Sequence, residues 1–231
     1  MRIHTIEHVP FEGPGAIVRY AEARGHVLTR TRLFLREPLP AIGEVDLLVI
    51  MGGPMSVHDE ERLDWLREEK RFLGQAVDAG ARLFGVCLGA QLLAEVLGGS
   101  VTSNNGREIG WFPVRLTAQG EKSPLFSGLG SEFPAFHWHG ETFSIPPGAA
   151  CIAESDACRH QAFEARGRIV GLQFHLETTP ESMELLISNC ADELEPRTGF
   201  IQSPEEMRSR QELAASTQTL LFQLLDNLMG E

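Results

Sequence analysis

Cys87 carries the strongest signal for chemistry in this chain. It follows an apolar run that ends at Val86, and an apolar segment with helical spacing begins at Leu88. Gly85 and Gly89 lie two residues on either side, the spacing of a nucleophile elbow, in which a sharp strand-to-helix turn presents the nucleophile and glycines allow close backbone approach. The N-terminus of a helix favours the thiolate, the form of cysteine that attacks. We therefore predict a cysteine nucleophile; the alternative is a buried, inert cysteine.

A histidine and a carboxylate two residues apart follow a later apolar run. In an extended segment His175 and Glu177 project to the same face, so the carboxylate can hold the imidazole in one tautomer while the other ring nitrogen faces the thiol. A third segment, 45–54, has the pattern of a buried strand that ends in a Gly-Gly-Pro turn. We predict a Cys–His–Glu triad, with the backbone N–H groups of Gly53 and Leu88 as the donors of an oxyanion hole. A core histidine and ordinary turns are the alternative.

These motifs resemble those of the class I (triad-type) glutamine amidotransferase domain, the glutaminase module also found in GMP synthetase, carbamoyl-phosphate synthetase and anthranilate synthase. The matching stretches, in chain order, are Gly52-Gly53-Pro54, the segment 85–91, His137-Trp138-His139-Gly140-Glu141 and Gln173-Phe174-His175-Leu176-Glu177. The resemblance runs from about Met1 to the end of the last stretch. One departure is Leu176, where the family usually has proline. Proline adds stiffness and no chemistry, so we expect an active triad.

The resemblance implies that the substrate is glutamine or a γ-glutamyl amide, whose amide carbonyl carbon meets Cys87 and forms a γ-glutamyl thioester that water hydrolyses. It further implies that the amino and carboxylate ends of glutamine bind to Gln91 and to the backbone of Trp138, Gly140 and Glu141. It implies no cofactor.

Two other groups of histidines and cysteines invite a functional assignment. We interpret His137 and His139 mainly as loop-shaping residues, because only His175 has a carboxylate at the triad offset. The two cysteines and the histidine within 151–160 lack a second pair of ligands at zinc-site spacing, so we expect no metal.

Composition limits the partners and the compartment. The 231 residues include 20 Lys and Arg against 32 Asp and Glu, a net charge of −12, and no basic run is present, so we expect neither nucleic acid nor a membrane as a partner. The N-terminus is too polar for a signal peptide, and no apolar stretch approaches the length of a membrane span. Four cysteines without tight pairing indicate a reducing compartment. We expect a cytoplasmic protein.

Strand-like and helix-like runs alternate along the first hundred residues. The predicted strands are 2–8, 26–34, 45–51 and 82–86, and the predicted helices are 14–24, 61–79 and 88–97. Short strands divided by Gly and Pro turns follow at 111–116, 132–138, 151–154, 161–165 and 169–175. This order predicts an α/β fold with a mostly parallel, flavodoxin-like central sheet flanked by helices, and a small partly antiparallel sheet.

We expect a single domain over 1–231, with a core to about residue 178 and a helical C-terminal extension over 179–231. Helices are predicted at 180–194 and 204–228, with a break at Pro196 and Gly199. The leucine stripe at 213–228 is expected to pack on the core of its own chain; contact with a partner or within a homodimer is the alternative.

We expect that no segment within these 231 residues uses the ammonia that the resemblance implies. Too few residues follow Glu177 for an ATP-using domain, and no phosphate-binding glycine loop appears. Either a separate synthase subunit is the partner, or the protein acts alone as a γ-glutamyl peptidase. A non-catalytic binding or regulatory protein on this fold stays open, although an intact Cys–His–Glu set weighs against it. A relative of the stress-protease and deglycase type fits less well, because Gln91 and the His-x-Glu pair match the glutaminase pattern.

Overall fold

Nine strands form one sheet in the order β2-β1-β3-β4-β9-β8-β7-β5-β6. The computed structural model describes residues 1–195 and 199–230. Five strands are parallel: β1 (Arg2–Glu7), β2 (Val27–Arg32), β3 (Leu47–Ile50), β4 (Leu83–Val86) and β9 (Ile169–Leu172). β3, β4 and β9 are buried along their whole length, as expected of parallel strands covered on both faces.

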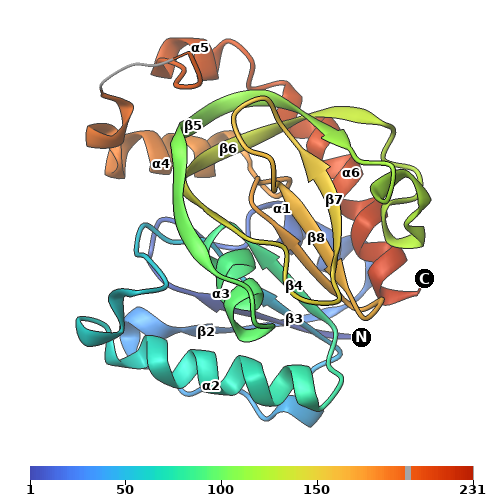
Figure 1. Ribbon diagram of the computed structural model, residues 1–231. Coiled ribbons are helices and arrows are strands. Elements are labelled where there is room, and N and C mark those ends of the chain that lie inside the picture. Colours follow the sequence, from blue (N-terminus) through green and yellow to red (C-terminus); the bar gives the residue numbers. More distant parts are fainter. Residues whose placement is uncertain (196–198, 231) are drawn as a thin grey trace.

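The other four strands extend the same sheet in antiparallel fashion (Figure 1). They are β5 (Val101–Leu116), β6 (Glu132–Phe143), β7 (Ala150–Glu154) and β8 (Ala162–Ala165). The α/β class with a mostly parallel centre is confirmed, and the antiparallel strands are joined to the parallel ones through β8 and β9. β5 and β6 are longer than the predicted 111–116 and 132–138, because their long ladder pairs residues as far out as Val101 with Phe143.

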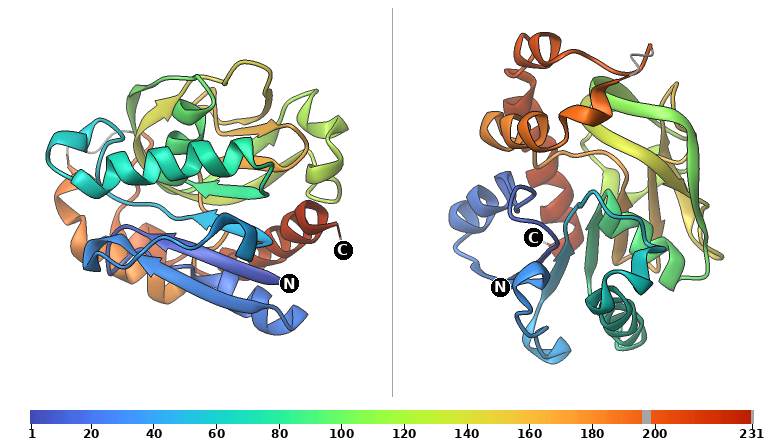
Figure 2. Two further views of the ribbon diagram at one scale, coloured as in Figure 1. Left: turned by 90° about the horizontal axis from the view of Figure 1, so that it is seen from below. Right: turned by 90° about the vertical axis from the view of Figure 1, so that its left-hand side faces the viewer.

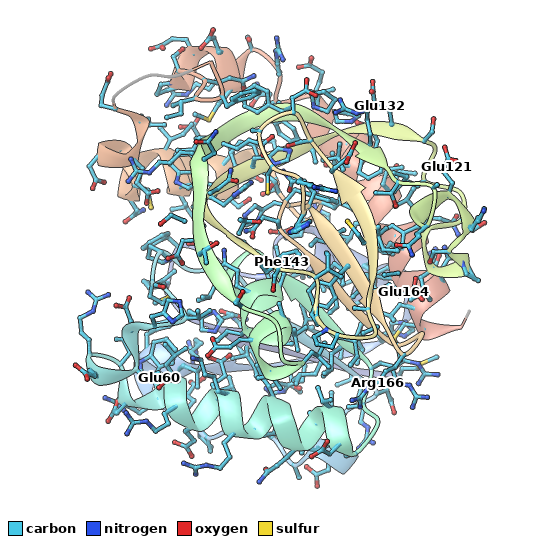
Figure 3. All side chains as sticks on the ribbon, viewed as in Figure 1. Glu60, Glu121, Glu132, Phe143, Glu164 and Arg166 are labelled. Carbon is cyan, nitrogen blue, oxygen red and sulfur yellow. The ribbon has the colours of Figure 1, made fainter. Side chains whose placement is uncertain are left out.

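Helices cover both faces of the sheet. Figure 2 shows α1 (Ala16–Arg24) on one face with the C-terminal helix α6, and α2 (Asp64–Asp78) and α3 (Leu88–Val96) on the other. Phe143, at the end of β6, lies over α3 (Figure 3) and belongs to the cluster of buried side chains that α2 and α3 share with the sheet. Within residues 1–195 and 199–230, six short 3-10 helices lie in connections: η1 (Leu33–Leu35), η2 (Ile42–Glu44), η3 (Asp59–Glu61), η4 (Gly120–Lys122), η5 (Pro124–Phe126) and η6 (Ala191–Leu194).

The described part of the C-terminal segment contains three helices, α4 (Pro180–Asn189), α5 (Pro204–Arg208) and α6 (Leu213–Met229). The single helix predicted over 204–228 is interrupted at 209–212, and the break predicted at Pro196 lies outside the described residues. The leucine stripe packs on the chain's own core: its buried members share one cluster with residues of the sheet and of α1, and they are Leu221, Leu224, Leu225 and Leu228. None of the described helices has the length and apolar character to span a bilayer.

Candidate active site

Cys87 lies in the turn between β4 and α3, at the carboxyl edge of the parallel strands. Its backbone adopts φ 51° and ψ −107°, a left-handed conformation that is rare for a residue with a side chain. The Cys87 N–H donates to the Leu172 carbonyl at 2.7 Å, and the Cys87 carbonyl accepts from the Gln91 N–H at 3.0 Å. These bonds from β9 and α3 hold the turn that places the thiol at the carboxyl edge of the sheet.

Gly85 and Gly89 allow α3 to approach the sheet. A Cβ atom on Gly89 would lie 2.1 Å from the Ile50 carbonyl oxygen, and one on Gly85 would lie 2.6 Å from the Gly89 carbonyl oxygen. A larger residue at either position would push the helix away and displace Cys87.

His175 and Glu177 form a buried pair beside this turn. β9 ends at Leu172, three residues before the predicted end of that strand, and the following turn is fixed by the His175 N–H, which donates to the Phe136 carbonyl at 2.8 Å. His175 Nδ1 lies 2.6 Å from Glu177 Oε1. Because a carboxylate accepts, Nδ1 carries the proton, and Nε2 is left free of other hydrogen bonds.

Three side chains from different loops converge on Gly52. A Cβ atom placed there would lie 3.6 Å from Cys87 Cβ, 3.4 Å from His175 Cε1 and 2.4 Å from Glu12 Oε2. The structure therefore brings the predicted nucleophile and the predicted base together, and it adds a second carboxyl group.

The pKa values of Cys87 and His175 are coupled. Burial raises the pKa of the Cys87 thiol, and the interaction with His175 opposes this increase. Burial by itself would lower the pKa of His175, but Glu177 and Cys87 outweigh it and raise that pKa well above its ordinary value. Two groups that interact this strongly titrate as a pair, so deprotonation of the thiol depends on transfer of its proton to the imidazole.

The peptide group between Gly52 and Gly53 is held in one orientation by His8. His8 Nδ1 donates to the Gly52 carbonyl at 3.0 Å, and His8 Nε2 lies 2.9 Å from Glu69 Oε1. Burial lowers the pKa of His8, but the Glu69 carboxylate outweighs it and the net shift is upward. Because the C=O and N–H of one trans peptide point in opposite directions, this bond turns the Gly53 N–H away from His8.

The two predicted oxyanion donors are neighbours. Gly53 is packed against Leu88, since a Cβ atom on Gly53 would lie 3.1 Å from Leu88 Cδ2. The Leu88 N–H is at the first position of α3, where helix geometry provides no acceptor. The backbones of Gly53 and Leu88 thus lie beside Cys87.

A cleft of about 620 Å³ opens at Cys87. The predicted substrate-binding residues all line it: Gln91, Trp138, Gly140 and Glu141. The Trp138 carbonyl lies 3.7 Å from the Cys87 Sγ, and the Gln91 side chain donates to Gln173 Oε1 at 3.2 Å. All predicted site residues thus come to one end of the sheet, as in other open α/β folds whose ligands bind at the carboxyl ends of the strands.

The sequence matches the family model for glutamine amidotransferase class-I over residues 15–193. The chain belongs to the class-I glutamine amidotransferases. The glutamine amidotransferase-like protein YfeJ of Salmonella typhimurium is 37% identical to it over 215 residues, which cover 90% of each chain. A crystal structure of a glutamine amidotransferase from Thermotoga maritima superposes with a TM-score of 0.90 at 29% identity, covering 100% of this chain and 99% of the other.

GMP synthases are also relatives of this amidotransferase. The glutamine-hydrolysing GMP synthase of Vibrio atlanticus is 34% identical over 136 residues, which are 58% of this chain and 24% of that one. The chain therefore matches about a quarter of the length of such a synthase.

Four residues of the amidotransferase site were missed by sequence analysis. Glu12 and His8 come from the loop between β1 and α1, Glu69 comes from α2, and Gln173 follows β9. Gln173 Nε2 lies 3.5 Å from the Cys87 Sγ. Gln173 belongs to one of the sequence stretches that match the family. The other three residues lie outside those stretches, and only tertiary contacts bring them to the site.

His137 and His139 lie on β6. Their interpretation as loop-shaping residues is therefore wrong, because neither is in a loop. Both face the buried Glu108 on β5, with Nδ1 of His137 and Nε2 of His139 at 3.4 and 3.1 Å from its Oε2. These three residues have the spacing of a metal-binding group. However, Gln161 Nε2 and Ser155 Oγ already donate to the same oxygen at 2.6 and 3.1 Å. The carboxylate is thus the centre of a hydrogen-bonded network that fixes the strand carrying Trp138.

Proposed function

We propose that this protein is a glutaminase-type amide hydrolase that cleaves the side-chain amide of glutamine through a Cys87–His175–Glu177 triad. The observation that carries the proposal is the convergence of Cys87 and His175 on Gly52, with Glu177 2.6 Å behind the imidazole. A thiol at a strained elbow, a base oriented by a carboxylate and two backbone N–H groups beside the thiol are what acyl transfer requires.

In the proposed reaction, the Cys87 proton passes to His175 and the sulfur attacks the amide carbon. A C–S bond forms, the carbonyl oxygen takes the negative charge, and the N–H groups of Gly53 and Leu88 stabilise it. The C–N bond then breaks, and His175 gives its proton to the departing ammonia. Water, deprotonated by the same imidazole, cleaves the γ-glutamyl thioester to glutamate and regenerates the thiol.

We propose that Gln91 and the backbone of Trp138, Gly140 and Glu141 bind the amino and carboxylate ends of the glutamyl group. Their position on the wall of the cleft beside Cys87 supports this assignment.

The proposal includes two ways in which this hydrolase acts, with a separate synthase subunit or alone. A separate synthase subunit is supported by the GMP synthases, in which the matching segment is joined to further chain. Hydrolysis of γ-glutamyl amides by this chain alone is supported by the volume of the cleft, because 620 Å³ lies in the range of sites for ligands well above amino-acid size.

The experiment that tests the proposal measures ammonia or amine release from glutamine and from a panel of γ-glutamyl amides. The Cys87→Ala variant should be inactive, whereas Cys151→Ala, which alters a free cysteine outside the cleft, should keep wild-type rates. Equal activity of wild type and Cys87→Ala would overturn the proposal.

A further inference from the structure

Glu12 adds a carboxyl group to the cleft wall close to His175. A Cβ atom on Gly52 would lie 2.4 Å from Glu12 Oε2 and 3.4 Å from His175 Cε1. These two atoms are therefore no more than about 6 Å apart. In the proposed reaction, His175 protonates the leaving nitrogen, and that nitrogen must therefore lie next to the imidazole. Glu177 is already bonded to the imidazole, so Glu12 is the carboxyl group near His175 that can contact a substituent on this nitrogen.

The Glu12 carboxyl group has no hydrogen bond or ion pair within the described part of the chain, although it faces four titratable side chains. These are His8, His175, Glu177 and Glu193. Two other acidic residues of the cleft have partners: Asp59 pairs with Arg62 at 2.8 Å, and Glu141 accepts from Ser56 at 3.1 Å. A half-buried carboxyl group without a partner is costly to ionise, and a cationic partner that arrives with the substrate would remove this cost.

The composition of the cleft wall indicates the charge of that partner. Among the described lining residues, five are acidic and one is basic: Glu12, Asp59, Glu141, Asp192 and Glu193 against Arg107. Arg107 lies 3.8 Å from Glu193, so its charge is already balanced. A cleft with this excess of negative charge attracts cations and repels anionic groups.

We propose that Glu12 is a specificity-determining residue that selects γ-glutamyl amides whose departing amine carries a second positive charge, such as the mono-γ-glutamyl derivatives of short aliphatic diamines. This inference rests on the proposed function. The chemistry is unchanged: the Cys87 sulfur displaces the amine, the C–N bond breaks, and His175 protonates the leaving nitrogen. Water then releases glutamate, while the distal ammonium of the diamine stays beside Glu12 until it departs.

The test uses three amides of similar size with different charge at the far end. These are the γ-glutamyl amides of 1,4-diaminobutane, of butylamine and of 4-aminobutyrate, with glutamine as the reference substrate. For the wild type we expect kcat/KM to be at least about tenfold higher for the diamine amide than for the butylamine amide, and lowest for the 4-aminobutyrate amide. In Glu12→Gln the ratio of the first two values should fall toward one. Glu22→Gln, which removes one carboxylate from an exposed position of α1, should keep the wild-type ratio.

The outcomes separate the two proposals. Hydrolysis of glutamine and of all three amides without preference for the diamine amide would overturn the role of Glu12 and leave the hydrolase intact. An equal loss on all substrates in Glu12→Gln would also overturn it, because Glu12 would then bind the ammonium of the glutamyl group common to them. No hydrolysis of any substrate would count against the proposed function itself. The wild-type comparison does not depend on how the variant folds.

Discussion

Replacement of Glu12 by glutamine should stabilise the protein at alkaline pH and leave its stability nearly unchanged at acidic pH. Burial raises the pKa of Glu12 from 4.5 to about 7 in the folded state. Between these two values the folded state holds a proton that the unfolded state has released, so wild-type stability falls as the pH rises through this window. Glutamine has the same shape and never ionises, and it therefore removes this loss.

The size of the effect follows from the pKa values. Because the pKa of Glu12 rises from 4.5 to about 7 on folding, ionisation lowers the free energy of unfolding by roughly 3 kcal/mol at pH 8 and by less than about 1 kcal/mol at pH 5. Glu12 is partly accessible to solvent, which screens its charge, so the gain at pH 8 should lie nearer 1–2 kcal/mol.

Urea unfolding followed by tryptophan fluorescence measures this difference, since the chain contains three tryptophans. Wild type, Glu12→Gln and the exposed control Glu22→Gln are compared at pH 5 and pH 8. The reasoning is refuted if Glu12→Gln changes stability by the same amount at both pH values. It is equally refuted if the variant is less stable than wild type at pH 8, because the ionised carboxylate would then be held by a partner in the folded state.

Three further predictions concern the reaction. A diazo-ketone analogue of glutamine should label Cys87 alone among the four cysteines, and Cys87→Ser should lose roughly a thousandfold or more in kcat/KM; peptide mapping that finds the label elsewhere contradicts this. His175→Ala should be nearly as damaging as loss of Cys87, because residues that act as a unit do not contribute additively, and Glu177→Gln should cost less; wild-type kcat in His175→Ala would exclude it as the base. Glu69→Gln should lower kcat by about tenfold with little change in KM, since it loosens His8 and the peptide that presents the Gly53 N–H; an effect on KM alone would show that this pair only shapes binding.

The parts of this structure that depend on local sequence were predictable. The elbow at Cys87 requires glycines at fixed offsets and a switch from strand to helix periodicity, and both are visible in ten consecutive residues. His175 and Glu177 lie in contact, as their offset of two residues predicts, although the strand ends at Leu172. The start of α4 was also predictable, since Thr179 and Ser182 form a capping box.

The parts that depend on contacts distant in the chain were not predictable. The outer halves of β5 and β6 contain polar and glycine residues with weak strand propensity, and they are strands only because they pair with each other. Glu12 and His8 are isolated polar residues in a loop, and only the packing of that loop against Gly52 brings them to the site. The break after Arg208 interrupts a continuous helical pattern, where a short helix with its own cap at Ser203 precedes α6.

The central claim is that Cys87 forms a γ-glutamyl thioester. Rapid mixing with glutamine, an acid quench and mass spectrometry of the digested protein test it directly. We predict a mass increase of one γ-glutamyl group on the peptide that contains Cys87, no such increase in Cys87→Ala, and glutamate as the product when the adduct is left to turn over. Continued release of ammonia by Cys87→Ala, or the same adduct on Cys151 with Cys87 unmodified, would contradict the account.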